Sequence, residues 1–181
     1  IIKKEGEEFF IGYTHTQRAQ IIKFKDYLSA YFYMLQKDCI RLNKFLENLE
    51  IPIGCGALAG SFVKKESYSQ AIKEIITYMK EKDIFKKINL SKNPLADVSE
   101  RDFLIEFLSI LSILQMHLSR LSEDFILYST KEFNFLNLPE EFSCGSSLLP
   151  HKKNPDFLEL VRGYTARVYG NLVTLLTLMK A

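Results

Sequence analysis

Apolar residues recur at intervals of three and four along residues 20–49, with charged residues between them. This spacing places apolar side chains on one face of a helix, so it predicts a long amphipathic helix over this stretch. The same argument predicts a second helix over residues 66–87 and a third from Ser99 to about Thr130. The third is apolar almost all round in its middle, which is typical of the central helix of a bundle.

Two short polar clusters predict where helices begin. Ser99 is followed three residues later by Asp102, as in a capping box, which predicts the start of the third helix. Asn154, Pro155 and Asp156 suit the cap and the first positions of a helix. Asn caps the end, Pro needs no N–H partner there, and Asp complements the helix dipole. They predict a fourth helix from residue 154 onward.

The segments between these helices carry turn residues rather than strand patterns. Residues 51–61, with Pro52 and three glycines, predict a loop. Residues 90–98 predict a turn, residues 131–153 an irregular segment, and residues 1–12 a helix end that runs into a turn. No stretch alternates apolar and polar residues over a useful length. The sequence therefore predicts an all-α fold, a bundle with three helices of roughly 25–30 residues that need long partners from other chains.

The composition is that of a globular protein with a core, because 47% of the residues are apolar and 25% are charged. Lys and Arg number 24 against 22 Asp and Glu, and they are spread along the chain. Without a basic stripe, no nucleic-acid partner is expected. The most apolar stretch, residues 103–118, contains Glu106 and Gln115, which favours a buried helix over a membrane span.

Cysteine and histidine are too scattered for a disulfide framework or a metal site. Cys39, Cys55 and Cys144 are odd in number and far apart, which favours a reducing, cytoplasmic location. The three histidines lack zinc-ligand spacing, so neither a metal nor another cofactor is expected. His117, in the middle of the third helix, is interpreted as a packed or capping residue. Cys144 is interpreted as a free turn cysteine, with a nucleophilic role as the alternative.

Residues 145–156 read GSSLLPHKKNPD and combine a sharp turn with a predicted helix start. Free N–H groups at that helix end, with Lys152 and Asn154 beside them, would attract a carboxylate or phosphate. Ser146 follows a glycine, where the backbone can turn and bring a hydroxyl close. On spacing alone, an ordinary polar turn before a capped helix is favoured over such an anion site.

Two further side chains are candidates for proton transfer. His15 lies in GYTHTQRAQ (12–20), a polar turn before the first long helix. Imidazole commonly moves protons near neutral pH, although an exposed structural histidine fits the pattern equally well. Glu159 lies one turn into the fourth helix, where a carboxylate could orient a histidine. Most glutamates at such positions only complement the helix dipole.

Three segments together resemble the argininosuccinate lyase family of the fumarase/aspartase superfamily. They are GYTHTQRAQ (12–20), SERDFLIEF (99–107) with HLSRLSEDFILYSTKEF (117–133), and GSSLLPHKKNPDFLELVRG (145–163). Residues 51–61 also resemble the Gly-rich loop of that family. The chain departs from the family pattern at Ile21, where proline is usual, at His151, where glutamine is usual, and in the run before Ser99. The sequence PHK around His151 is closer to adenylosuccinate lyase.

The resemblance implies an elimination that splits argininosuccinate into arginine and fumarate, with no cofactor. By motif position, Ser146 would be the base that removes a proton from the carbon beside a carboxylate. The resulting carbanion places negative charge on that carboxylate. Lys152 and Asn154 match positions that stabilise such charge, as preorganised donors and cations do.

On the leaving-group side, the resemblance assigns His15 to proton transfer, Glu159 as its acidic partner, and Thr14 to substrate contact. In the family, the regions of His15 and Ser146 come from different subunits of a tetramer, so a homotetramer with shared sites is implied. Residues 1–181 would be the central helical domain of a longer chain, because the family's N-terminal domain and C-terminal region have no counterpart in the sequence.

Two other interpretations remain open at this point. The chain could belong to a related lyase that acts on adenylosuccinate or another succinyl adduct. It could also be a catalytically silent structural or oligomerisation module, because the 181-residue sequence lacks family segments that bind substrate.

Overall fold

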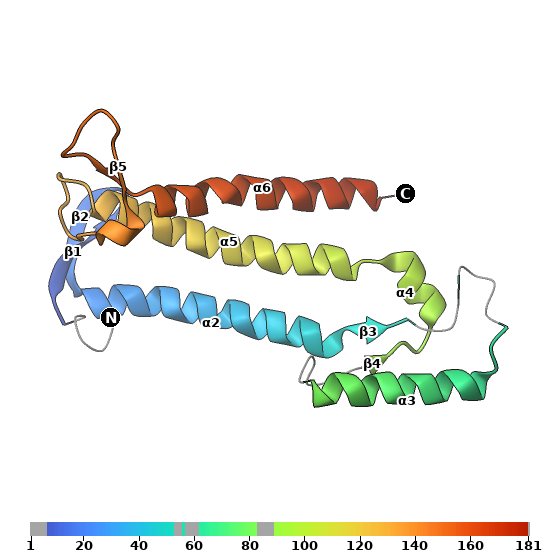
Figure 1. Ribbon diagram of the computed structural model, residues 1–181. Helices are drawn as coiled ribbons and strands as arrows, with labels where there is room; N and C mark the ends of the chain where they lie inside the picture. Colours follow the sequence, from blue (N-terminus) through green and yellow to red (C-terminus); the bar gives the residue numbers. More distant parts are fainter. Residues whose placement is uncertain (1–6, 53–55, 57–61, 83–88, 181) are drawn as a thin grey trace.

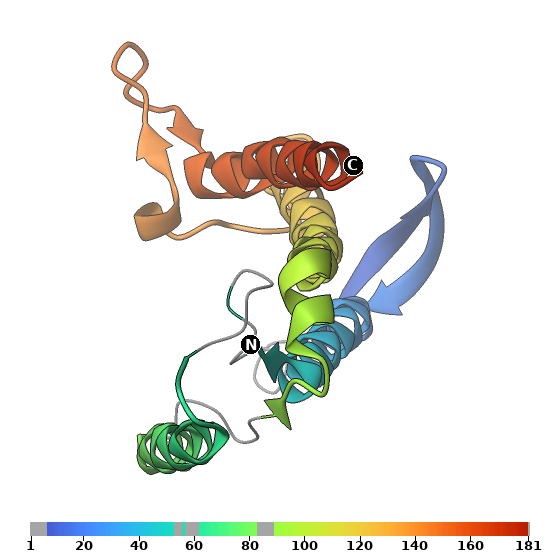
Figure 2. The same ribbon diagram turned by 90° about the vertical axis from the view of Figure 1, so that its right-hand side faces the viewer.

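The computed structural model describes residues 7–52, 56, 62–82 and 89–180. Three long helices lie side by side and run in alternating directions (Figure 1). They are α2 (Phe24–Asn48), α5 (Phe103–Tyr128) and α6 (Asp156–Leu178), and α5 packs against both of the others. The predicted long-helix bundle is confirmed. A shorter helix, α3 (Lys65–Glu81), lies apart from these three in both ribbon views (Figures 1 and 2).

The prediction that the chain contains no strand is wrong at the N-terminal side of α2. Strand β1 (Phe9–Thr14) pairs in antiparallel fashion with β2 (Gln17–Lys23). Residues 9–12 of the predicted helix end are therefore strand, while residues 1–6 lie outside the described residues, and the long helix begins at Phe24 rather than at residue 20. The apolar side chains of residues 21–24 match a helical spacing, but pairing across a two-residue turn satisfies the backbone of this segment instead.

The turn predicted at residues 90–98 is partly helical. Helix α4 (Pro94–Glu100) begins there, because the Asn93 side chain accepts a hydrogen bond from the Ala96 N–H and Pro94 takes the first helical position. Two very short strand pairs connect other segments: β3 (Glu50–Ile51) with β4 (Asn89–Leu90), and β5 (Cys144–Gly145) with β6 (Lys153–Asn154).

Neither predicted helix cap forms. Ser99 lies inside α4, where its hydroxyl donates to the Ala96 carbonyl at 2.8 Å, and Arg101 takes a left-handed conformation (φ 52°) that separates α4 from α5. Asp102 stands at the cap of α5 without a side-chain cap bond. Pro155 stands at the cap of α6, since the backbone of Asn154 is used in β6. The predicted loop 51–61, including Cys55, and the end of the predicted second helix fall largely outside the described residues.

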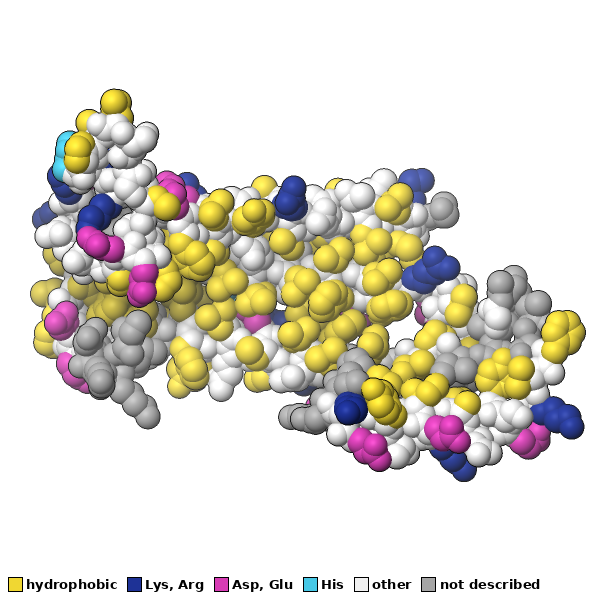
Figure 3. All heavy atoms as spheres, in the orientation of Figure 1, with side chains coloured by type: hydrophobic (Ala, Val, Ile, Leu, Met, Phe, Trp, Pro, Cys, Tyr) yellow, Lys and Arg dark blue, Asp and Glu magenta, His cyan; other side chains and the backbone are white. Residues whose placement is uncertain are grey.

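Few apolar side chains are buried in the described part of the chain. The buried set is Tyr31, Phe45, Ile110 and Tyr128. Apolar side chains instead run along the outside of the bundle (Figure 3), and the exposed large ones include Phe32, Tyr33 and Ile40 on α2 and Leu160, Tyr164 and Val173 on α6. Helix α5 has the length and mean hydropathy (1.3) of a membrane span, and 6% of that window is buried. The expectation that this helix is buried is therefore not met within one chain.

Candidate functional site

His15 and Thr16 form the tip of the β1–β2 hairpin. Both have positive φ angles, 52° and 60°, and Thr14 pairs directly with Gln17 across them. Positive φ at both central residues is the pattern of the two-residue turn whose twist matches paired strands. The Thr16 hydroxyl donates to the His15 carbonyl at 2.6 Å. Thr14 and His15 are exposed, so the turn presents both residues to solvent.

Ser146 sits just inside a second hairpin, which β5 and β6 close. Its N–H donates to the Lys152 carbonyl at 3.1 Å, and Gly145 pairs with Lys153. The Ser146 Oγ accepts hydrogen bonds from the N–H groups of Leu148 and Leu149, at 3.3 and 3.1 Å. Two N–H dipoles aimed at one oxygen favour negative charge on it. These two hydrogen bonds hold the Ser146 Oγ in place, and the role of base that the family resemblance implies for it stays a prediction.

The two lysines of this hairpin have different surroundings. Lys153 forms an ion pair with Glu140 in the 3₁₀ helix η1 (Glu140–Phe142), with 2.5 Å between Nζ and Oε1, and the ammonium lowers the pKa of the Glu140 carboxyl. Lys152 is exposed, and no carboxylate of the described residues lies within ion-pair distance of it. Lys153 therefore ties the hairpin to η1, while the ammonium of Lys152 is available to a ligand.

Asn154 and Glu159 lie next to the Ser146 hairpin. Asn154 is half-buried in β6, and Glu159 lies one turn into α6, where its N–H donates to the Pro155 carbonyl at 3.0 Å. Glu159 is exposed; a hydrogen bond from nearby Arg162 to Glu123 raises the pKa of that guanidinium, and the charge of Glu159 adds to the shift. Ser146, Lys152 and Asn154 thus lie in one hairpin that leads into α6, and Glu159 lies in the first turn of that helix.

The His15 turn is not part of this group within one chain. Both hairpins lie at the same end of the bundle (Figure 1), but Figure 2 shows that they project to opposite sides of α5. His15 and Thr14 therefore stand on one side, and Ser146 and Lys152 on the other. The predicted pairing of Glu159 with His15 cannot form inside one chain.

The surroundings of Cys144 disfavour a nucleophilic thiolate. It is exposed and free of disulfides, and a hydrogen bond to the Asp156 carboxylate raises the pKa of its thiol. A raised pKa keeps the sulfur protonated, whereas a nucleophilic cysteine needs the thiolate. The interpretation of Cys144 as a free turn cysteine is supported.

His117 is packed between two helices, as expected. Its Nδ1 lies 2.6 Å from Oδ2 of Asp38 on α2, and its side chain is 11% exposed. Sequence reasoning did not find Asp38, nor a second carboxylate between the same helices, Asp124. Tyr27 and Tyr31 are four residues apart and therefore lie on one helix face. This spacing could have indicated that their two hydroxyls share a partner, which is Asp124.

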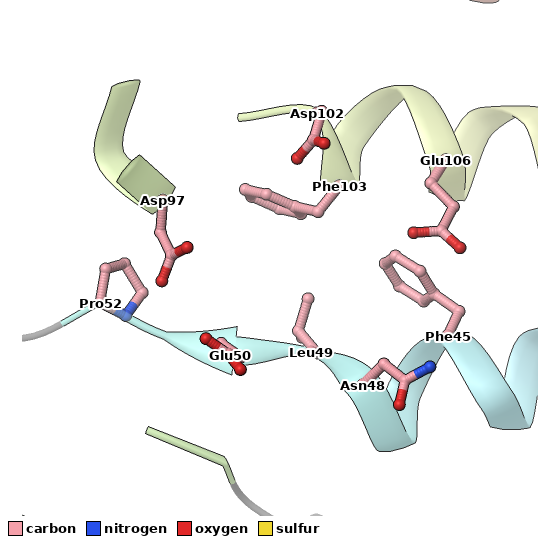
Figure 4. A pocket seen from close by; sticks show the side chains of 9 residues that line it. All are labelled: Phe45, Asn48, Leu49, Glu50, Pro52, Asp97, Asp102, Phe103 and Glu106. Atoms are coloured by element: carbon pink, nitrogen blue, oxygen red, sulfur yellow. The ribbon is translucent and has the colours of Figure 1, made fainter. Parts of the chain in front are cut away.

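Two cavities flank the bundle. One, of about 360 Å³, lies beneath the β1–β2 hairpin and is lined by residues that include Phe10, Tyr13, Tyr27, Asp124 and Phe133. The other, of about 240 Å³, lies at the opposite end between α2, α4 and α5 (Figure 4). Four carboxylates line it: Glu50, Asp97, Asp102 and Glu106. None of the predicted site residues lines this second cavity.

The acidic cavity has no arrangement suited to a metal. Oδ2 of Asp97 is buried without a hydrogen-bond partner in the described ranges, and its side chain points toward the cavity in Figure 4. Across the described residues, no group of three or more His, Cys, Asp or Glu side chains could hold a metal ion.

Comparison with known proteins gives a consistent family match. A family model described as lyase matches residues 3–170. An argininosuccinate lyase from Clostridium tetani is 50% identical over 93% of this chain, and one from Clostridium acetobutylicum is 46% identical over 98%. The chain spans only 36% and 39% of the lengths of these two curated relatives.

Solved structures share the same arrangement. A crystal structure of an EDDS lyase in complex with formate matches 93% of this chain with a TM-score of 0.78 and 29% identity. That match covers 32% of the EDDS lyase chain. A fumarate lyase:delta crystallin from Brucella melitensis matches 99% of this chain and 39% of its own, with a TM-score of 0.77. Because the identity is 21%, the second match shows similarity of fold only.

Proposed function

Because the chain belongs to the lyase family that matches residues 3–170, we propose that it is the central part of an argininosuccinate lyase. The observation that carries this proposal is the identity of 46–50% to argininosuccinate lyases over more than nine tenths of the chain. The whole protein would split argininosuccinate into arginine and fumarate, a step of arginine biosynthesis. It would need no cofactor, because acid, base and charge stabilisation all come from side chains.

In the proposed reaction, Ser146 removes a proton from the carbon next to a substrate carboxylate. The electron pair left on that carbon forms the double bond of fumarate as the bond to the arginine nitrogen breaks. Lys152 and Asn154 stabilise the negative charge that builds up on the carboxylate, which is where preorganised charge lowers a barrier most. The free Lys152 ammonium and the two N–H groups on the Ser146 Oγ support these roles.

His15, oriented by Glu159 of a neighbouring chain, gives a proton to the departing nitrogen, and Thr14 contacts the substrate. The exposed position of His15 at a hairpin tip supports this role, since the tip can enter a site on another subunit. The projection of the two hairpins to opposite sides of the bundle supports an active site built from more than one chain (Figure 2).

We further propose that the protein is a homotetramer. The exposed apolar side chains of α2 and α6, together with the apolar band across the middle of the bundle on the face in Figure 3, are the kind of surface that long helices bury against copies of themselves. A cytoplasmic location is proposed as well, because the two described cysteines, Cys39 and Cys144, are free, as is usual in a reducing compartment.

The first experiment measures fumarate release by the full-length protein from argininosuccinate and from adenylosuccinate. We expect turnover of argininosuccinate only. The Ser146→Ala variant should lose turnover but still bind substrate, and Ser147→Ala, which changes the exposed neighbouring serine, is the matched control. Turnover of adenylosuccinate would point to the related lyase, and retained turnover by Ser146→Ala would reject its role as base. Absence of turnover on both substrates would favour a silent module.

The second experiment tests whether sites are shared between chains. The Ser146→Ala and His15→Ala variants are each expected to be inactive. Mixed and reassembled in equal amounts, they should regain about one quarter of the wild-type activity, since each site draws the two residues from different subunits at random. Failure of the mixture to regain activity, although mixed tetramers form, would place both residues of a site on one chain.

A further inference from the structure

A single carboxylate oxygen joins α2 to the end of α5. Oδ2 of Asp124 accepts hydrogen bonds from the hydroxyls of Tyr27 and Tyr31, each at 2.8 Å. The two tyrosines are one helical turn apart on α2, so both hydroxyls reach the same atom. Tyr31 is buried and Tyr27 half-buried, which strengthens these bonds because water competes for them less.

The β1–β2 hairpin rests directly on this contact. The Phe10 ring of β1 packs edge-on against the rings of Tyr27 and Tyr128, with centroids 5.6 and 5.9 Å apart. Tyr128 lies one turn beyond Asp124 on α5, and its ring packs 5.8 Å from that of Tyr27. Further along the hairpin, Tyr13 contacts Phe133 at 5.4 Å. Tyr27 and Tyr128, the rings beneath Phe10, therefore lie on the two helices that Asp124 joins, and Phe133 lies in the segment that follows α5.

The packing beneath the hairpin is incomplete. The cavity of about 360 Å³ separates parts of β1 and β2 from α2 and α5, and Asp124 lines it. Ring atoms that face a void lose the close contacts that would otherwise fix a side chain in place. Edge-on ring contacts also tolerate tilting more readily than an interdigitated core does. The two hydrogen bonds to Asp124 are thus the directional interactions between the two helices beneath the hairpin. The open end of the hairpin is held by the bond from the Phe24 N–H to the Glu8 carbonyl and by the ion pairs of Glu7.

We propose that Asp124 is a positioning residue for the reaction. Its hydrogen bonds with Tyr27 and Tyr31 fix the packing beneath the β1–β2 hairpin, and this packing determines the position of His15. This inference rests on the proposed function, in which His15 passes a proton to the leaving nitrogen. A shift of about 1 Å in a reacting group can lower a rate on the order of 100-fold. A small displacement of the hairpin on the helices would therefore lower the rate by moving His15.

The test compares variants of the full-length protein. Asp124→Ala removes the acceptor, whereas Tyr27→Phe combined with Tyr31→Phe removes both donors but keeps the rings. We expect both to lower kcat by about 10- to 100-fold and to leave KM within about twofold. Asp124→Asn, which keeps a neutral acceptor oxygen, should recover most of the activity. Glu123→Gln is the matched control, since that side chain pairs with Arg162 on α6 instead.

A purely structural role would lower the unfolding temperature without changing kcat measured well below it, and that result would overturn the proposal. A second readout does not depend on activity. Backbone amides of residues 11–18 should exchange hydrogen at least about tenfold faster in the double Phe variant, while those of α6 should not. Unchanged exchange in the hairpin would also reject the proposal. If the wild type releases no fumarate, the proposed function fails, and the exchange rates alone decide whether Asp124 holds the hairpin.

Discussion

The Asp38 carboxylate on α2 lies 2.6 Å from the imidazole of His117 on α5 and 2.6 Å from the guanidinium of Arg41. Asp38 is 2% exposed, so these two side chains take the place of the water molecules that would otherwise solvate its carboxylate. Helices α2 and α5 also meet through the stacked rings of Phe45 and Phe107, 5.5 Å apart, so the Asp38–His117 hydrogen bond is a directional contact beside apolar packing. A buried carboxylate tolerates the loss of a partner poorly.

We therefore predict that His117→Ala lowers the free energy of unfolding by about 2 kcal/mol, less than the loss of a sole partner because Arg41 remains. The measurement is the urea midpoint at fixed protein concentration. The double variant Asp38→Leu/His117→Leu should unfold close to the wild-type midpoint, because an apolar pair of similar volume needs no partners. A double variant as unstable as His117→Ala would contradict this account.

The tyrosines that bind Asp124 predict a loss of stability at alkaline pH. Burial raises the pKa of Tyr27 and of Tyr31 above the ordinary value of 10.0, and the hydrogen bond to Asp124 raises both further. A pKa that is higher in the folded state adds stability that is complete below the unfolded value and declines as pH rises above it. The unfolding midpoint should therefore fall as pH increases beyond about 10.

This fall should be smaller in the variant with Phe at both positions. Phenolate absorbance gives a direct check, because the wild type should gain two more phenolates on unfolding at alkaline pH than that variant gains. Equal gains would mean that Tyr27 and Tyr31 ionise freely in the folded protein.

The tip of the β1–β2 hairpin predicts a stabilising substitution. Thr16 has φ 60°, a left-handed conformation that is unfavourable for a β-branched residue. We expect Thr16→Asn to raise the free energy of unfolding by about 0.5–1 kcal/mol, since Asn tolerates this conformation and is common in such turns. Gln17→Asn, at a strand position, is the control and should give no gain. Thermal unfolding of the full-length protein measures both.

The contrasting surroundings of Lys152 and Lys153 predict contrasting kinetics. Lys152→Met should lower kcat by at least about 100-fold, because the ammonium would stabilise charge that develops in the transition state. Lys153→Met removes the ion pair with Glu140 and should lower kcat by less than about tenfold. Steady-state kinetics on the proposed substrate measures both. The reverse order would exchange the roles of the two lysines.

The sequence predicted the three long helices because their apolar spacing persists over six or more turns. The boundaries of these helices depend on competing local structures, such as a hairpin or an earlier helix start, which the apolar spacing does not reveal. The helical spacing continues back to Ile21, yet a turn through His15 and Thr16 pairs that segment with β1 instead. Neither residue is Gly, Asn or Asp, so the usual signal of a two-residue turn is missing. Ser99 failed as a cap because Asn93 begins α4 earlier.

The candidate site was predictable only in part. Ser146, Lys152 and Asn154 are close in sequence, and the short hairpin keeps them close in space. The hydrogen bonds from Leu148 and Leu149 to the Ser146 Oγ, and the pairing of Lys153 with Glu140, depend on backbone details that spacing does not encode. Asp124 was missed because its partners lie more than ninety residues away in the sequence.

The four apolar residues buried in the described chain carry a thermodynamic consequence. In the proposed homotetramer, the exposed apolar area of α2 and α6 would leave water only when copies associate, so the free energy of folding would be linked to that of assembly. The unfolding midpoint of such a protein rises with the logarithm of its concentration. Dilution alone should therefore unfold it, and the amount of protein in the cell would help to determine whether it is folded.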